Sequence, residues 1–194
     1  SGGEMAVAEA AKLLSAAKSP VILNGAGVVL AAGGIEASMA LAELLDAPVC
    51  CGYQHNDAFP GSHPLFAGPL GYNGSKAGME LISRADVVLA LGTRLNPFST
   101  LPGYGIDYWP KDAKIIQVDI NPDRIGLTKP VAVGIIGDAK KVAQGILARL
   151  TDSAGDAGRE DRKNLISTTK STWAQELTSM DHEDDDPGTT WNQR

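Results

Sequence analysis

Short apolar segments rich in β-branched residues alternate along this chain with longer segments whose apolar positions recur at helical spacing. The short segments are Val21–Asn24, Val49–Cys51, Val87–Leu91, Ile115–Val118 and Val131–Ile135, and a further short strand is expected near Leu65–Ala67. Val87–Leu91 is apolar at every position, as is typical of a parallel strand that is buried on both faces. The alternation predicts an α/β fold, with a doubly wound, mostly parallel sheet of six strands and helices on both faces.

Amphipathic segments between these strands are predicted to be helical. They are Glu4–Ala17, a helix opened by the glycines at positions 25, 27, 33 and 34, Lys76–Ala85 and Ala139–Leu150. In the first helix, Val7, Ala11 and Leu14 form one apolar stripe. Asp138 stands where it can cap the last helix. If the strand near Leu65–Ala67 is the third, the expected strand order is 3-2-1-4-5-6, a Rossmann-like arrangement.

The chain changes character after residue 150. Residues 151–160 are mostly small and polar and indicate a linker, a polar helix is expected over about Asp161–Ser179, and an acidic tail follows. We therefore predict a Rossmann-like domain over residues 1–150 and a separate polar segment over residues 151–194. The chain opens with Ser1-Gly2-Gly3 instead of an initiator methionine, which favours a fragment of a longer protein.

Composition narrows the range of partners. The 194 residues are 43% hydrophobic and 21% charged, as in a globular protein, and no apolar run approaches the roughly 18 residues that a membrane-spanning helix needs. The net charge of −6 disfavours nucleic acid or an anionic membrane as a partner. Much of this charge lies in residues 181–194, which contain five acidic residues and one arginine.

The two cysteines, Cys50 and Cys51, are neighbours in the sequence. A disulfide between adjacent residues would close a strained ring, so both thiols are expected to be reduced, as in a cytoplasmic protein. One cysteine pair also lacks the two arms of a structural zinc site.

Glycines and polar residues follow four of the predicted strands. These residues are Gly25, Ala26 and Gly27 after the first strand, Gly92, Thr93 and Arg94 after the central strand, Asp119 and Ile120 after the next, and Gly137 and Asp138 after the last. Open α/β sheets bind ligands at the carboxyl ends of their strands. Glycine backbone and an arginine there suit a phosphate, and a carboxylate suits a ribose or adenine, so the set predicts a nucleotide-binding crevice.

Two simpler interpretations stay open. The glycines are also compatible with tight turns, although the set as a whole favours the crevice, and for Asp138 alone a helix cap is the preferred interpretation. An NAD site of the usual kind fits poorly, because Gly25-Ala26-Gly27-Val28-Val29-Leu30 lacks a third glycine and the second strand ends in Cys51-Gly52 instead of an acid.

Histidines offer little further chemistry. His55 and His63 lie in the irregular segment Gly52–Gly74 and His182 lies in the acidic tail, and their spacing predicts solvated histidines with no metal site. The polar run Tyr53–Asp57 leaves the end of the second strand and is expected to line a cavity.

Several motifs together resemble the central domain of thiamine-diphosphate-dependent enzymes. They are Pro20-Val21-Ile22-Leu23-Asn24-Gly25-Ala26-Gly27, Phe59-Pro60-Gly61-Ser62-His63-Pro64-Leu65, Ala85-Asp86 through Gly92-Thr93-Arg94, Gln117-Val118-Asp119-Ile120-Asn121-Pro122 and Gly137-Asp138. The resemblance covers about residues 4–150 in family order. Residues 52–109 and the segment from Ser179 to Trp191 are more narrowly similar to the sulfoacetaldehyde acetyltransferase family.

This resemblance implies a parent chain with pyrimidine-binding and diphosphate-binding domains on either side of the central one, working as a homo-oligomer. The parent would use thiamine diphosphate and Mg²⁺ to convert sulfoacetaldehyde and phosphate into acetyl phosphate and sulfite. The glutamate that activates the cofactor and the motif that binds the metal belong to those other domains. We therefore expect no catalytic and no metal-ligating residue in this chain, and no activity from it alone.

In some members of the family, the central domain binds FAD or ADP, and the ten crevice residues above match those positions. This chain departs from the FAD-binding pattern at Asn96-Pro97-Phe98, where those members carry charged residues. An empty crevice in a purely structural module is therefore the competing expectation.

Two further families are alternatives. The glycine turns and Asn96-Pro97-Phe98 also resemble the cofactor turns of sirtuin-type NAD-dependent deacylases, although the zinc-binding cysteine pairs of that family are missing. A different thiamine-diphosphate enzyme, such as a relative of acetolactate synthase, is the other alternative.

Overall fold

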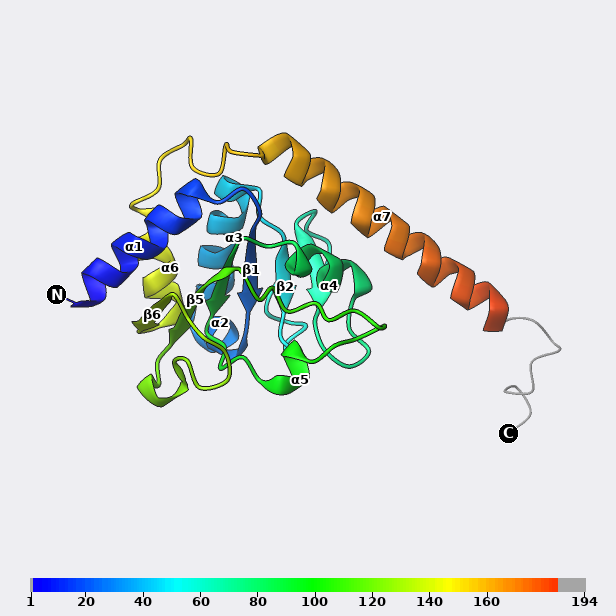
Figure 1. Ribbon diagram of the computed structural model, residues 1–194, viewed down its shortest axis with the longest axis horizontal. Helices are drawn as coiled ribbons and strands as arrows, with labels where there is room; N and C mark the ends of the chain where they lie inside the picture. Colours follow the sequence, from blue (N-terminus) through cyan, green and yellow to red (C-terminus); the bar gives the residue numbers. More distant parts are fainter. Residues whose placement is uncertain (1, 185–194) are drawn as a thin grey trace.

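The centre of the molecule is one parallel sheet, seen in a computed structural model that describes residues 2–184 (Figure 1). Its strands are β1 (Pro20–Asn24), β2 (Val49–Cys51), β3 (Phe66–Pro69), β4 (Val87–Leu91), β5 (Lys114–Asp119) and β6 (Val133–Ile136). They are ordered β3-β2-β1-β4-β5-β6, and every neighbouring pair is parallel. The predicted α/β class and strand order are therefore confirmed.

Helices cover both faces of this sheet (Figure 1). On one face lie α1 (Gly2–Ala16), α2 (Ala26–Leu30), α3 (Gly34–Leu45) and α6 (Ala139–Leu147), and on the other lie α4 (Lys76–Ser83) and α7 (Arg159–Asp184). The short helices α5 (Pro97–Thr100) and η1 (Pro122–Arg124) follow β4 and β5.

Side chains of the central strands alternate between two apolar cores. Ile22 and Leu89 contribute to the core under α1, α3 and α6, whereas Leu23 and Val88 contribute to the core under α4. All four are fully buried. Burial on both faces explains why β4 is apolar throughout and why β1 is apolar up to its last residue, Asn24, instead of alternating with polar residues.

The segment after β1 differs from the single helix predicted for it, because it forms two helices, α2 and α3. The chain turns back at Ala31, which is extended, and Gly33 has a φ of +80°. A side chain at Gly34 would place its Cβ 2.3 Å from the carbonyl oxygen of Val28. The glycine pair therefore ends one helix and starts the next, and allows a contact too close for any larger residue.

Several element ends are shifted by a few residues from their predicted positions. β6 begins two residues later than predicted, and α6 ends at Leu147 instead of Leu150. Beyond α6, Arg149 and Leu150 donate their N–H groups to carbonyls three residues earlier, so the last turn is tighter than an α-helix.

The final helix, α7, is longer than predicted, since it begins two residues before Asp161 and continues five residues beyond Ser179. Its start is anchored by Arg162, and its middle is packed beside α4, where Lys76 forms an ion pair with Glu176 at 3.0 Å. In Figure 1, its far end extends past the sheet. The first part of the predicted acidic tail is therefore helical, and residues 185–194 lie outside the described residues.

None of the helices in the described part of the chain is both long and apolar enough to cross a membrane.

The division of the chain into a domain over residues 1–150 and a separate polar segment over residues 151–194 stays a prediction.

Candidate functional site

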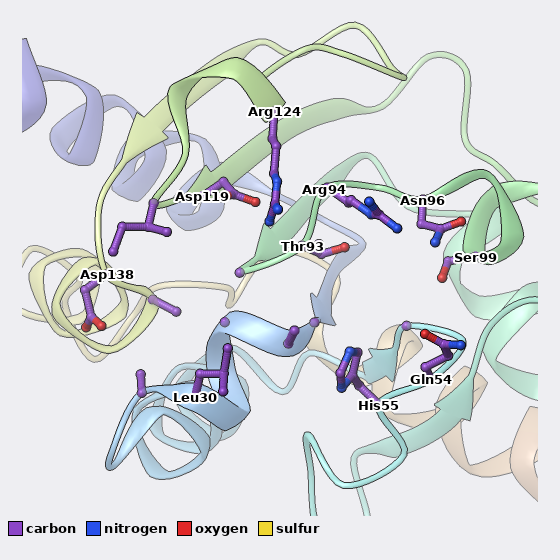
Figure 2. A pocket seen from close by; sticks show the side chains of 18 of the residues that line it. Leu30, Gln54, His55, Thr93, Arg94, Asn96, Ser99, Asp119, Arg124 and Asp138 are labelled. Atoms are coloured by element: carbon purple, nitrogen blue, oxygen red, sulfur yellow. The ribbon is translucent and has the colours of Figure 1, made fainter.

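A pocket of about 480 Å³ opens at the carboxyl ends of the strands (Figure 2). It lies beside the neighbouring strands β1 and β4, after which the chain continues toward opposite edges of the sheet. This volume is typical of small-molecule sites. All ten residues that the sequence assigned to a crevice line this pocket: Gly25, Ala26, Gly27, Gly92, Thr93, Arg94, Asp119, Ile120, Gly137 and Asp138. The tertiary structure thus brings the four strand ends together as the sequence predicted.

The glycines at this end of the sheet are required by packing between two turns. A Cβ at Gly25 would lie 2.5 Å from Thr93 Cβ, and one at Gly27 would lie 2.7 Å from Gly92 Cα. Gly92 also has a φ of +63°, which a residue with a side chain rarely adopts. Packing between the two turns is thus enough to explain these glycines, and any case for a ligand depends on the other residues of the pocket.

Two arginines supply the positive charge of the pocket, Arg94 on the loop after β4 and Arg124 on η1 after β5. Both side chains are exposed to solvent, and no other residue in 2–184 forms a hydrogen bond or ion pair with either guanidinium. The sequence prediction missed Arg124. The strand-end rule could have found it, since Arg124 lies only five residues after Asp119.

The two aspartates of the pocket have different local roles. Asp138 caps α6, because its Oδ1 accepts a hydrogen bond from the N–H of Lys141 at 3.0 Å, which confirms the preferred interpretation of that residue. Asp119 is only 5% exposed, and its Oδ1 accepts a hydrogen bond from the N–H of Asn121 at 2.8 Å. Asp119 therefore shapes the loop that leads into η1.

Apolar side chains stand exposed beside these polar groups. Leu30 is 84% exposed and Ile120 is 73% exposed, and both line the pocket. Exposed leucine and isoleucine at the edge of a cavity offer contact area for a flat apolar group.

The polar run after β2 lies where the sequence predicted, since Tyr53, Gln54 and His55 line the pocket. His55 Nδ1 lies 3.8 Å from Asp57 Oδ1. The prediction of a solvated histidine is wrong for His63. Its ring is mostly buried and lies edge-on against Phe59, Nε2 is hydrogen-bonded to Glu43 at 3.0 Å, and Nδ1 accepts a bond from the N–H of Leu65. The side chain of His182 lies outside the described residues.

Both cysteines are buried free thiols on β2, Cys50 in the core under α4 and Cys51 in the core on the opposite face of the sheet. Burial raises the pKa of Cys50 far above its usual value, and Cys51 raises it further. Burial, together with nearby Asp57, raises the pKa of Cys51 to about 12. Neither thiol is therefore a nucleophile at neutral pH.

The part of the chain that the structure describes contains no cluster of three or more His, Cys, Asp or Glu residues that could hold a metal ion. Residues 2–184 therefore offer no set of three or more such side chains that could by itself hold Mg²⁺.

Comparison with known proteins gives a family match and several relatives that agree with each other. Residues 7–146 match the family described as thiamine pyrophosphate enzyme, central domain. The sulfoacetaldehyde acetyltransferase of Roseovarius nubinhibens is 82% identical over 194 residues, which is all of this chain and 32% of that protein. The enzyme of the same name from Castellaniella defragrans is 53% identical over 95% of this chain and 31% of its own length.

A probable acetolactate synthase large subunit from Methanocaldococcus jannaschii is more distant, at 38% identity over 77% of this chain and 24% of that protein. This chain therefore spans about a third of the length of the acetyltransferases that it matches. The deacylase alternative finds no support in these matches. The match over residues 7–146 shows that the chain belongs to the thiamine pyrophosphate enzyme family and carries its central domain, and the parallel sheet agrees with this assignment.

Proposed function

We propose that the polypeptide containing this chain is a sulfoacetaldehyde acetyltransferase, which converts sulfoacetaldehyde and phosphate into acetyl phosphate and sulfite. The observation that carries this proposal is the 82% identity with the Roseovarius nubinhibens enzyme over the whole chain, compared with 38% identity with the acetolactate synthase relative. In such an enzyme, thiamine diphosphate held with Mg²⁺ supplies the reactive carbanion when bound. The pyrimidine-binding and diphosphate-binding domains of the parent would hold it, and the parent would work as a cytoplasmic homo-oligomer.

Within this scheme, the chain is a central domain that is catalytically inactive by itself. Its two cysteines are buried thiols with raised pKa values, and residues 2–184 contain no cluster of three or more metal-ligating side chains. Its contribution is structural, since it positions its neighbours and offers one pocket.

The activity is tested by comparing the complete polypeptide with the 194-residue chain. Both are supplied with thiamine diphosphate, Mg²⁺, sulfoacetaldehyde and phosphate, and the release of acetyl phosphate and sulfite is measured. We expect both products in equal amounts from the complete polypeptide and none from the chain alone. Formation of acetolactate from pyruvate, without sulfite release, would instead favour the acetolactate synthase alternative. Turnover by the chain alone would contradict its assignment as an inactive domain.

We also propose that the pocket binds an adenosine diphosphate group, either as ADP or as part of FAD, without using it in catalysis. Support comes from the volume of about 480 Å³, from the guanidinium groups of Arg94 and Arg124, which pair with no residue in 2–184, and from the exposed apolar pair Leu30 and Ile120. An arginine can bind a phosphate through two parallel hydrogen bonds, and apolar side chains can cover an adenine ring.

A thermal shift experiment tests this second proposal, because a ligand that binds only the folded state raises the melting temperature. ADP and FAD are added to the purified chain up to millimolar concentration, with Arg94→Ala as a comparison. We expect a rise in melting temperature that Arg94→Ala reduces. The same melting temperature with and without nucleotide would favour the structural module with an empty pocket.

A further inference from the structure

Large apolar side chains are exposed beside the pocket, on the loops that follow β2, β3 and β4. The loop after β2 carries Tyr53, and the loop after β3 carries Tyr72. Phe98 lies on α5, and Leu101 and Tyr104 lie on the turn that follows it. All five side chains are exposed to solvent within residues 2–184, and four of them are aromatic. We call these five side chains the aromatic surface.

Contacts between the loops join these side chains into one surface. The rings of Tyr53 and Phe98 stack, with their centroids 6.0 Å apart. The hydroxyl of Tyr104 donates a hydrogen bond to the carbonyl oxygen of Gly74 at 3.1 Å, which ties the turn that carries Tyr72 to the turn that carries Tyr104. The surface is therefore ordered before any partner binds, so that less conformational entropy is lost on binding.

The aromatic surface continues onto the far half of α7. Tyr104 lies edge-on against Trp173, with the ring centroids 5.6 Å apart. Leu177 and Met180 follow Trp173 by four and seven residues, so these three side chains lie on one side of α7, and Leu177 and Met180 are exposed. Figure 1 shows that this end of α7 extends beyond the sheet. Within residues 2–184, the last part of this apolar stripe therefore stays uncovered.

Two of the segments that form this surface also lack charged residues. Residues 58–75 and 95–106 contain no Lys, Arg, Asp or Glu, although 21% of the whole chain is charged. At the centre of a protein–protein interface, charged residues are depleted and aromatic residues are enriched. Exposed apolar side chains that gather in one place mark interaction sites. The composition of these loops is therefore typical of a surface that another polypeptide covers.

We infer that the aromatic surface and the far end of α7 are the docking surface for the parts of the parent polypeptide that lie outside this chain. This inference rests on the proposed function, because it takes the parent to be a longer acetyltransferase of the kind that this chain matches. The Roseovarius nubinhibens enzyme matches this whole chain within 32% of its own length, so most of that enzyme lies outside the matched part. A covalently attached partner has a high effective concentration, which favours it over a second copy of the chain. Its contact face is mainly apolar, since a charge buried there without a partner would be costly.

Hydrogen exchange of backbone amides, measured by mass spectrometry, tests the docking surface. The exchange rates of residues 70–74 and 95–106 are compared between the complete polypeptide and the 194-residue chain. We expect these amides to exchange at least about 10-fold more slowly in the complete polypeptide, because a covered amide exchanges only after the partner detaches. Residues 151–153 are the control, since they are exposed at the opposite end of the sheet from α5 and should exchange equally in both (Figure 1). Equal rates over residues 70–74 and 95–106 would overturn the inference.

A pair of substitutions tests the same surface in the complete polypeptide. Tyr72→Ser and Phe98→Ser are combined, because these side chains are 74% and 61% exposed. The matched control combines Met5→Ser and Leu127→Ser, at positions that are 76% and 69% exposed and lie outside the aromatic surface. We expect the first pair to lower the melting temperature of the complete polypeptide by several degrees, and the control pair to leave it unchanged. In the 194-residue chain, both pairs should have equally small effects, and a larger loss there from the first pair would contradict docking as the cause.

The oligomeric state of the 194-residue chain distinguishes the other possible occupant of the surface. Analytical ultracentrifugation of the chain should show a monomer, as expected when the partner is the missing part of the parent. A dimer that Tyr72→Ser combined with Phe98→Ser dissociates would show that a second copy covers the surface, and the inference would be wrong.

Hydrogen exchange needs no substrate, so the docking surface and the proposed reaction can fail separately. Slow exchange over residues 70–74 and 95–106 in a complete polypeptide that forms no acetyl phosphate would leave the docking surface standing and overturn the proposed reaction. Acetyl phosphate formation with equal exchange rates in the two proteins would support the reaction and overturn the docking surface.

Discussion

Arg162 is the residue whose removal should most weaken the attachment of α7 to the sheet domain. Its side chain is 5% exposed and donates five hydrogen bonds to backbone carbonyls. The acceptors are the oxygens of Lys18 at 2.7 Å, Leu45 at 2.7 Å, Asp46 at 3.1 Å, Gly155 at 2.6 Å and Ala157 at 3.1 Å. One guanidinium thereby joins the end of α3, the segment before β1 and the linker to α7.

The cost of replacing Arg162 with methionine follows from these bonds. Hydrogen bonds to a charged group contribute about 1.5–3 kcal/mol each, but they are not additive here because one group makes all five. Burial lowers the pKa of Arg162, and the positive charge of Arg159 lowers it further, so part of the gain is offset by the cost of holding a buried cation. We expect a net loss of about 4 kcal/mol in the free energy of unfolding.

Urea denaturation followed by circular dichroism measures this loss. A decrease of about 4 kcal/mol corresponds to a melting temperature lower by roughly 8–16 °C for a chain of this size. Arg162→Lys keeps the charge with fewer donors and should recover about half of the loss. Arg149→Ala is the control, since Arg149 is exposed and donates one bond, to Gly145. If Arg162→Met is as stable as this control, the reasoning is refuted.

Three further predictions concern the core, the turns and the thiols. Leu89→Ala in the centre of β4 should lower the free energy of unfolding by about 2–5 kcal/mol in urea denaturation, because Leu89 is fully buried; a loss below 1 kcal/mol would contradict this. Gly92→Ala should lower the melting temperature more than Gly105→Ala. Both glycines have positive φ, but only at Gly92 would the new Cβ meet another atom, Gly27 Cα at 2.7 Å. Equal decreases in melting temperature would show that this contact is unimportant. Cys51 should react with a thiol reagent at pH 8 only after unfolding, since its pKa is raised to about 12 in the folded state against 9.0 for the unfolded thiol. Because the folded-state pKa is the higher one, the stability that this thiol contributes is complete below pH 9 and is lost as the pH rises toward 12, which denaturation at several pH values measures.

The candidate site shows which pocket residues can be predicted from the positions where the strands end in the sequence. Gly25, Gly92, Asp119 and Asp138 were assigned to one crevice because each follows an apolar run, and parallel strands end at the same edge. Arg124 was missed because the prediction stopped at Ile120, four residues earlier, and because the hydrogen bond from Gln117 Nε2 to the Arg124 carbonyl oxygen, which helps to fix this loop, is not encoded in a pattern of apolar runs. The role of the glycines was also decided by tertiary contacts, since only the structure shows that two turns meet there.

Local periodicity determined most of the fold by itself, because a strand buried on both faces must be apolar throughout and a helix on a sheet must have one apolar stripe. The sheet order followed from the usual arrangement of doubly wound folds, and the family followed from short sequence motifs. The tertiary structure alone decided the length of α7, the burial of His63 and the relation of the two arginine loops. Each of these three features depends on contacts between residues that are far apart in the sequence or on single hydrogen bonds, such as those of the Gln117 side-chain amide. A pattern of apolar and polar residues does not encode the geometry of such contacts.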